Sequence, residues 1–418
     1  MKILVVGATG FIGKSIYQSL HSLEHEVIAG VRNPDTFDGK AIKIDFLKLV
    51  EDSTLIQRLE GVDVVINAVG IIAPTKDQSF ETMHTLAPIK LFESAKKANV
   101  TRIIQISALG AQTGTTPYHT SKHEADTYLK NLGVNYAILY PSVVYGNDGK
   151  STALFQALAS LPIVPIIGDG SQILQPVKIE DLVQTVISIV DSKEKNIELD
   201  VVGKTPISYK KLLLGFRKYL SIKGTKTVSV PTLGTNMIGK ILDEPTVNHD
   251  NIIMLNQGNS ADVSPLANFL NYTPKSIEET LFNTQANNAQ KLFASLYFLR
   301  PLLRIIIGFV WIWSGIVSAF LHPQVDALKL LHDVGISSPF DVPLLYISSF
   351  LDIAIGVVTL VGYKLKEVLI FQMLVIFVYT VILTLLAPYH WLHPFGPVLK
   401  NLPLIVTIYI LVLLEKYR

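Results

Sequence analysis

The chain has 418 residues, more than one compact core usually holds, so we expect about two or three folded units. Its formal net charge of +2, without long runs of lysine or arginine, argues against a nucleic-acid-binding protein. The absence of cysteine excludes disulfides, iron–sulfur clusters and a thiol nucleophile, and suits a folded part in a reducing compartment.

Short apolar segments alternate with helical patterns through the first 145 residues. Continuous apolar runs of this length suit strands that are covered on both faces, with the intervening helices making right-handed crossovers. We therefore predict an α/β fold with a Rossmann-type, doubly wound parallel sheet. The expected strands are residues 2–7, 26–31, 41–44, 63–69, 102–107 and 135–140.

The first expected strand ends in the glycine loop GATGFIG. Gly7 permits the tight turn, Gly10 lets the backbone approach a pyrophosphate, and Gly13 lets the next helix pack on the strand. The free N–H groups at the start of that helix attract phosphate. This context favours dinucleotide binding over a purely structural turn. Further expected cofactor contacts in this loop are Thr9, Phe11 and Ile12.

The residue after the second expected strand indicates which dinucleotide is preferred. An acidic residue there binds the ribose 2′-hydroxyl of NAD, but this chain has Arg32, whose guanidinium suits a 2′-phosphate. We expect NADP(H), with NAD(H) as the alternative cofactor, and a solvated surface arginine is the plainer interpretation of Arg32. The other expected contacts are Asp45 at the adenine, and Asn67, Ala68, Val69 and Pro141 along the cofactor.

The stretch ISALGAQTGTTPYHTSKHEAD contains the candidate catalytic residues Ser107, Tyr118 and Lys122. A spacing of four places Tyr118 and Lys122 on the same face of a helix, where the ammonium can lower the pKa of the phenol and hold ribose hydroxyls. Tyr118 can then exchange a proton with a substrate oxygen that Ser107 hydrogen-bonds. The spacing also arises by chance, but its place after the fifth strand favours catalysis.

From about residue 151 to residue 284 the alternation gives way to pieces punctuated by proline and glycine, such as LPIVPIIGDG. A lobe at the carboxyl ends of the strands is where substrate contacts are expected in an open sheet. We therefore expect a Rossmann domain at 1–150, substrate-lobe segments that complete the fold at 151–290, and a membrane domain at 291–418.

The last part of the chain carries little charge: 14 of residues 292–418 are Asp, Glu, Lys or Arg, against 56 of the first 291. We expect an all-α four-helix transmembrane bundle rather than a soluble bundle, whose helices would keep a polar face. Three segments approach the roughly 20 residues of a spanning helix, and the fourth does so only if it starts near residue 398. They are residues 302–321, 343–363, 368–388 and 402–414.

Four spans would place both ends of this domain on one side of the membrane. Six basic residues flank the spans on that side, against Lys329 and Lys400 on the other, so we expect the Rossmann domain and both termini in the cytoplasm. The first apolar segment is too short for a signal peptide. The six basic residues are Lys291, Arg300, Lys364, Lys366, Lys416 and Arg418.

Several motifs of the first 290 or so residues resemble those of an atypical short-chain dehydrogenase/reductase: GATGFIG, VRNP, ISALGA, YHTSKHEAD, YPSVVYGNDG and QPVKIEDLV. The similarity is greatest to an epimerase-like branch that includes the NADPH-binding accessory subunit of respiratory complex I. The C-terminal part, with HPFGPVLKNLPLIV, resembles a DoxX-like membrane module. This fusion is typical of bacterial membrane proteins, which implies a bacterial inner membrane.

Some positions depart from the pattern of extended dehydrogenases. Thr85 stands where an asparagine is usual, Tyr140 stands where an arginine is common, and the interval from Ser107 to Tyr118 is short. Some members of the branch bind the cofactor without known turnover. In that case Tyr118 and Lys122 mainly hold the nicotinamide ribose.

Two functions therefore remain open. The first is a membrane-anchored NADP(H)-dependent oxidoreductase or epimerase that acts on a small molecule, a lipophilic carbonyl or quinone-type substrate. The second is a non-catalytic NADPH-binding assembly or sensing subunit of a membrane redox complex. Both involve a lipid bilayer, and neither involves nucleic acid or a resident metal. Roles stay open for Asp352, in the second apolar segment, and for the expected outer-loop residues His322, His332, His390 and His393.

Overall fold

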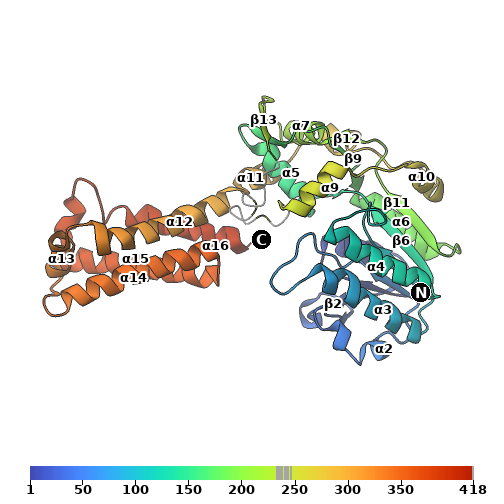
Figure 1. Ribbon diagram of the computed structural model, residues 1–418, viewed down its shortest axis with the longest axis horizontal. Coiled ribbons are helices and arrows are strands. Elements are labelled where there is room, and N and C mark those ends of the chain that lie inside the picture. Colours follow the sequence, from blue (N-terminus) through green and yellow to red (C-terminus); the bar gives the residue numbers. More distant parts are fainter. Residues whose placement is uncertain (232–238, 240–243, 245–246, 417–418) are drawn as a thin grey trace. The chain divides into compact units, whose positions relative to one another are not determined.

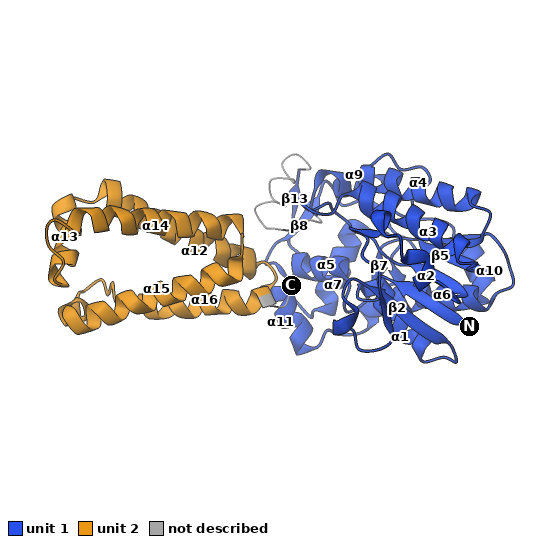
Figure 2. Ribbon diagram, turned by 90° about the horizontal axis from the view of Figure 1, so that it is seen from below, with its two compact units in different colours: residues 1–295 blue, residues 296–418 orange. Residues whose placement is uncertain are grey.

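A computed structural model describes residues 1–231, 239, 244 and 247–416 of the chain. The chain divides into two compact units, residues 1–295 and residues 296–418, which are coloured separately in Figure 2. The expected Rossmann domain and substrate lobe both fall in the first unit. Arg418, one of the basic residues counted above, lies outside the described residues.

Seven parallel strands form the central sheet of the first unit, which confirms the doubly wound α/β fold. All six expected strands are present. The seventh, β11, was not predicted because buried and exposed residues alternate along it. In spatial order the strands are β11 (Ile197–Val201), β6 (Asn135–Pro141), β5 (Arg102–Ile106), β4 (Val64–Asn67), β1 (Lys2–Val6), β2 (Glu26–Val31) and β3 (Ala41–Lys43).

Helices cover both faces of this sheet (Figure 1). In α6, apolar residues recur every three or four positions, which gives the helix one apolar stripe to bury against the sheet. The first face carries α1 (Phe11–His21), α6 (Ile179–Asp191) and α10 (Ser264–Leu270). The second face carries α2 (Leu55–Arg58), α3 (Ala87–Lys97) and α4 (Pro117–Asn131). Short helical turns in the connections are η1 (Pro34–Thr36), η2 (Leu49–Glu51) and the π-helical η3 (Glu81–Leu86).

The rest of the first unit has an apolar core of its own, in which Phe155, Phe216 and Phe282 pack against one another. Its helices are α5 (Lys150–Ser160), α7 (Tyr209–Tyr219), α9 (His249–Gln257), η4 (Leu281–Asn283) and α11 (Asn288–Leu296), which ends at the boundary of the two units. Its strands pair as β7 (Val144–Tyr145) with β10 (Val177–Lys178), β9 (Ile173–Leu174) with β12 (Ile207–Ser208), and β8 (Val164–Ile167) with β13 (Thr227–Val230).

The second unit is helical throughout its regular structure. Its elements are α12 (Leu299–Ile316), η5 (Val317–Leu321), α13 (Gln324–Asp333), α14 (Asp341–Val361), α15 (Leu365–Leu386), η6 (Pro388–Leu392) and α16 (Asn401–Lys416). Helices α12 and α14 approach closely, since a Cβ atom on Gly356 would lie 2.7 Å from the carbonyl oxygen of Gly308. Small residues of this kind permit tight packing of helices in membranes.

Among the residues that the structure describes, three apolar helical stretches are long enough to cross a bilayer, namely Asn288–Leu321, Asp341–Val361 and Leu365–Leu386. The first of these includes α11. Large apolar side chains such as Phe309, Phe377 and Leu385 are more than half exposed on their outer surfaces. The fourth expected span forms the shorter apolar helix α16, so its crossing of a membrane stays a prediction.

Candidate functional site

The glycine loop between β1 and α1 is closed by tight backbone contacts. Gly7 has a φ of +86°, which favours glycine, and a Cβ atom there would lie 3.2 Å from the carbonyl oxygen of Ala68. A Cβ atom on Gly13 would lie 2.2 Å from the carbonyl oxygen of Gly7, so a side chain at 13 would push the helix off the loop. The two expected cofactor residues Ala68 and Val69 therefore lie directly beside Gly7.

The start of α1 is available to an anion. Gly10, the N-cap, supplies no side-chain cap, and the first turn of α1 holds no acidic residue. The N–H of Lys14 donates to the carbonyl of Gly10 at 2.7 Å, which leaves the N–H groups of Phe11, Ile12 and Gly13 without an acceptor inside the helix. Thr9 and Gly10 are exposed. This end of the helix fits the pyrophosphate of a dinucleotide.

Arg32 and Asp45 lie at the same edge of the sheet. The N–H of Gly7 donates to the carbonyl of Gly30 at 3.0 Å, which ties the glycine loop to the end of β2, and Arg32 follows β2 with an exposed side chain. Asp45 is half-buried and accepts a hydrogen bond from the N–H of Leu47 at 3.2 Å. Arg32 thus has the freedom to bind a phosphate, whereas part of the Asp45 carboxylate is already engaged.

Asn67 and Pro141 are buried at the carboxyl ends of β4 and β6. The Asn67 side-chain amide donates to Gln105 at 2.8 Å, and its Oδ1 accepts from the N–H of Val69 at 3.2 Å. The carbonyl of Pro141 accepts from the N–H of Leu109 at 2.9 Å. Both residues therefore shape the loops that follow the strands, and the Asn67 side chain is committed to contacts inside the protein.

Helix α4 carries Tyr118 and Lys122 on one face. Thr116 caps its start by accepting from the N–H of His119, and Pro117 occupies the first helical position, where a missing N–H costs nothing. The ammonium of Lys122 lies 5.7 Å from the centre of the Tyr118 ring and donates to the carbonyl of Ile106 at 3.3 Å. The structure therefore brings these two predicted residues together at the end of β5.

Ser107 points to a residue that the sequence did not single out. Its hydroxyl donates to the carboxylate of Asp126, which lies one helical turn after Lys122 and is buried. Burial raises the pKa of Asp126 to about 6, while the Ser107 hydrogen bond and the charge of Lys122 oppose that rise. Because the Ser107 hydroxyl donates its hydrogen bond to Asp126, its oxygen can only accept a hydrogen bond from another group in this rotamer. The only sequence signal for Asp126 was its spacing of four from Lys122.

The expectation that Lys122 lowers the pKa of Tyr118 is wrong. Burial raises the pKa of the Tyr118 phenol well above its usual value, and the charge of Asp126 raises it further. Burial also lowers the pKa of Lys122 to about 8, against the favourable charge of Asp126. Desolvation is the largest cause of the raised Tyr118 pKa, so the phenol is held protonated at neutral pH.

His84 is a second neighbour of Tyr118 that sequence reasoning missed. It lies in η3, buried, with its ring 5.3 Å from the Tyr118 ring in an edge-to-face arrangement. Its Nε2 accepts from the N–H of Ile71 at 3.0 Å, and its Nδ1 lies 3.2 Å from the hydroxyl of Ser121. Burial lowers the pKa of His84 to about 2, and the charge of Lys122 lowers it too, so the imidazole stays neutral.

Thr85 stands where an asparagine is usual in extended dehydrogenases. Its side chain contacts α4, but not at Tyr118 or Lys122. Its hydroxyl lies within hydrogen-bond distance of the carbonyl of Ser121, at 2.9 Å, and of the carboxylate of Glu124, at 3.1 Å. His84 is the η3 residue that contacts Tyr118. A Cβ atom on Gly70 would lie 3.6 Å from the Lys122 ammonium and 3.7 Å from Nε2 of His84. A side chain at residue 70 would therefore occupy space beside both groups.

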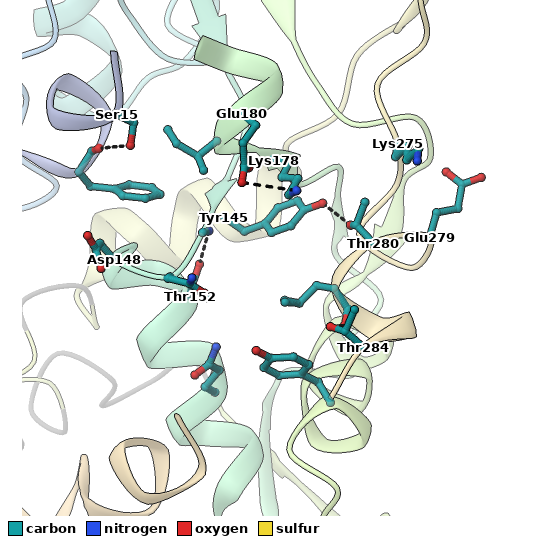
Figure 3. Close-up of a pocket in the computed structure, with 17 residues that line it drawn as sticks. Ser15, Tyr145, Asp148, Thr152, Lys178, Glu180, Lys275, Glu279, Thr280 and Thr284 are labelled. Atoms are coloured by element: carbon teal, nitrogen blue, oxygen red, sulfur yellow. Dashed lines mark hydrogen bonds and ion pairs between the residues drawn. The ribbon is translucent and has the colours of Figure 1, made fainter. Parts of the chain in front are cut away.

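A polar cavity of 600 Å³ lies beside the start of α1 (Figure 3). Phe11 of the glycine loop forms part of its wall. The Tyr145 hydroxyl pairs with that of Thr280 at 2.6 Å, and Lys178 pairs with Glu180 at 3.4 Å. These four polar groups of the cavity are therefore paired with one another.

The polar residues of the second unit hold its loops together. His332 pairs with Asp341 at 2.9 Å, and His390 pairs with Asp333 at 3.3 Å. Two of the four expected outer-loop histidines, His332 and His390, therefore have carboxylate partners within the unit. Asp352 lies midway along α14, as the sequence predicted.

Comparison with known proteins places both parts of the chain. Residues 7–160 match a family model described as NAD(P)H-binding, and residues 308–409 match one described as a DoxX-like family. The mouse protein NADH dehydrogenase [ubiquinone] 1 alpha subcomplex subunit 9, mitochondrial, is 26% identical over 48% of this chain and 54% of its own length. The chain thus spans about half the length of that relative.

A second relative is the ceramide reductase of Caulobacter vibrioides, which is 21% identical over 58% of this chain and 77% of its own length. Among solved structures, a UDP-glucuronic acid 4-epimerase from Bacillus cereus in complex with UDP-glucuronic acid and NAD covers 70% of this chain and 99% of its own, with a TM-score of 0.54 and 20% identity. That likeness is one of fold. The chain therefore joins a Rossmann-type domain that matches an NAD(P)H-binding family model to a domain that matches a DoxX-like one.

Proposed function

We propose that this chain, an NAD(P)H-binding Rossmann domain joined to a DoxX-like domain, is a membrane-anchored NADP(H)-dependent oxidoreductase that reduces a lipophilic carbonyl or quinone-type compound. The observation that carries the proposal is the grouping of Tyr118, Lys122 and His84 at the end of β5 and beside Gly70. The glycine loop lies at the same edge of the sheet, where the strands end.

Tyr118 is the proton donor in this proposal. Its raised pKa keeps the phenol protonated at neutral pH, as a donor to a developing alkoxide must be. A bound NADPH would supply a hydride to the carbonyl carbon. Tyr118 would give its proton to the carbonyl oxygen and would regain a proton from water. Neutral His84 packs against the ring of Tyr118 and holds it in place. The Lys122 ammonium lies near the same ring, where it can bind the ribose.

The cofactor preference in this proposal is NADP(H). The exposed guanidinium of Arg32 follows β2 at the edge tied to the glycine loop, which supports binding of a 2′-phosphate. The same loop would also accept the pyrophosphate of NAD(H), because its backbone donors do not distinguish the two dinucleotides.

The membrane part of the proposal places the catalytic unit on the cytoplasmic face of a bacterial inner membrane, with both termini in the cytoplasm. The three long apolar helices and the surplus of basic residues on one side support this arrangement. An anchored enzyme meets substrates that partition into lipid, and the name of the Caulobacter relative is that of a lipid reductase.

Purified full chain tests the proposal. We expect it to oxidise NADPH when apolar aldehydes, ketones or quinones are added, and we expect Tyr118→Phe to bind NADPH normally but to lose about 10²–10⁴-fold in rate, the usual worth of general acid catalysis. Lys122→Ala should weaken both binding and rate. Equal rates for wild type and Tyr118→Phe would remove Tyr118 from the chemistry.

One observation is equally compatible with a second function. The Ser107 hydroxyl donates to Asp126, and a fixed Ser107 would serve a non-catalytic NADPH-binding subunit of a membrane redox complex equally well. Complementation of a deletion strain separates the two functions. Full rescue by Tyr118→Phe, together with failure of a Gly10 variant with a bulky side chain, would favour the subunit over the enzyme.

A further inference from the structure

An apolar cavity of 190 Å³ lies in the first unit, apart from the polar cavity of Figure 3. Its walls come from α5, α9 and the strands between them, and they include Leu154, Phe155 and Leu158 of α5 and Ile252, Met254 and Leu255 of α9. Leu154 and Ile252 are buried, whereas the other four are half-buried. The lining is therefore mainly aliphatic and aromatic.

The cavity adjoins the proposed catalytic group. His119, which follows Tyr118 on α4, forms part of its wall, and the rings of the two residues lie 5.5 Å apart. Ile72 also lines the cavity and follows Ile71, whose N–H binds His84. The elements that hold the Tyr118 ring are thus the same ones that form one end of the cavity.

We propose that this cavity binds the unbranched apolar chain of the substrate, with the reacting carbonyl held outside it at Tyr118. The inference rests on the proposed function and narrows the substrate to a carbonyl compound with a linear hydrocarbon tail. A volume of 190 Å³ is below the roughly 300–1,000 Å³ of pockets that bury a whole ligand, so it suits a chain and not a complete molecule.

The chemistry of the lining favours this occupant over a nucleotide sugar. Such a ligand carries a charged diphosphate and is usually bound by basic side chains, whereas the described lining of this cavity includes neither lysine nor arginine. Its polar members are His119, Ser151, Tyr209, Asn251 and Asn259, and the rest of the lining is apolar apart from Gly258. A methylene moved from water into such a lining gains affinity up to about fourfold. Affinity should therefore rise with chain length until the cavity is filled.

Two variants on α9 form a matched pair for the test. Met254→Trp adds bulk at a lining position, and Ile253→Trp adds the same bulk at the neighbouring position, which does not line the cavity. Both residues are half-buried, so both variants should fold, and NADPH binding checks this. The probe is a straight-chain methyl ketone with a diazirine at the far end of the chain, cross-linked to the reconstituted full chain.

We expect cross-links in residues 154–158 and 252–255, reduced at least about fivefold by Met254→Trp and unchanged by Ile253→Trp. We also expect KM for methyl ketones to fall with chain length in wild type, and to stop falling at a shorter chain in Met254→Trp. Cross-links confined to the second unit, or equal labelling of the two variants, would overturn the inference.

The two failures are separable. Labelling of α5 and α9 without any NADPH oxidation would keep the chain-binding cavity and remove the proposed redox function. NADPH oxidation whose KM does not depend on chain length would keep the enzyme and remove the cavity as its substrate site.

Discussion

Protonation of His84 offers a test of how the site is held together. In the folded chain burial holds the pKa of His84 near 2, whereas an unfolded histidine has a pKa of about 6.5. The unfolded state therefore binds the extra proton as the pH falls below about 6.5. His84 contributes stability that is complete above that pH and is lost progressively below it. Linkage gives a loss of about 2 kcal/mol between pH 7.5 and pH 5.0.

Asp126 works in the opposite direction and must be separated. Its folded pKa of about 6 lies above the ordinary value of about 3.9, so the folded state gains about 1 kcal/mol as the pH falls from 7.5 to 5.0. The wild type alone would show only the difference. The informative quantity is the stability of wild type minus that of His84→Gln, since glutamine cannot titrate and can still accept from Ile71.

We expect this difference to shrink by about 2 kcal/mol from pH 7.5 to pH 5.0, as linkage requires for one buried neutral histidine. Pulse proteolysis of the full chain in urea, read from the loss of residues 1–295, measures the free energy of unfolding of the first unit. For Asp126→Asn the sign is opposite: the stability of wild type minus that of this variant should grow by about 1 kcal/mol as the pH falls from 7.5 to 5.0. A difference between wild type and His84→Gln that stays constant with pH would mean that His84 is solvated in the folded chain and gains its proton at the same pH as in the unfolded chain.

Three further predictions concern the cofactor loop and the membrane unit. Arg32→Asp should weaken NADPH binding about 10- to 150-fold relative to NADH, the worth of a charge-assisted hydrogen bond, and equal affinities in the wild type by calorimetry would rule out a 2′-phosphate contact. Gly13→Ala places a Cβ atom 2.2 Å from the Gly7 carbonyl, so we expect a loss of about 1–3 kcal/mol in stability and weaker NADPH binding, whereas unchanged melting would show that the loop yields. A reporter fused after Arg418 should be active only in the cytoplasm, and periplasmic activity would contradict four spans.

Most of the sheet could be predicted from the sequence because most residues of its central strands are buried. Residues 3–6 are all apolar and buried, and residues 102–106 are all buried although Arg102 and Gln105 are among them. A glycine loop follows the first of these runs directly. The strand β11 escaped notice because Glu198 and Asp200 alternate with buried residues in it. Its place at the sheet edge leaves one face in water, and only its parallel pairing with β6 identifies it.

The site was predicted in part. Tyr118 and Lys122 are four apart on one helix, so a local rule placed them together. His84 joins them only through tertiary packing of η3 on α4, which no spacing in the sequence reveals. Asp126 lies on α4, four residues after Lys122, but its hydrogen bond with Ser107 depends on the packing of β5 on that helix. The predicted direction of the shift in the Tyr118 pKa was also wrong. Desolvation depends on how deeply the phenol is buried, and the sequence alone does not give that depth.

Transfer of deuterium tests the central claim most directly. Full chain incubated with NADPH deuterated at C4 and a straight-chain methyl ketone should yield an alcohol that is one mass unit heavier, detected by mass spectrometry, when the correct face of the nicotinamide carries the label. Tyr118→Phe should yield at least about a hundredfold less of this product while binding the cofactor equally well. An alcohol without deuterium from either labelled form of NADPH, or labelled product at the same rate from Tyr118→Phe, would contradict the account.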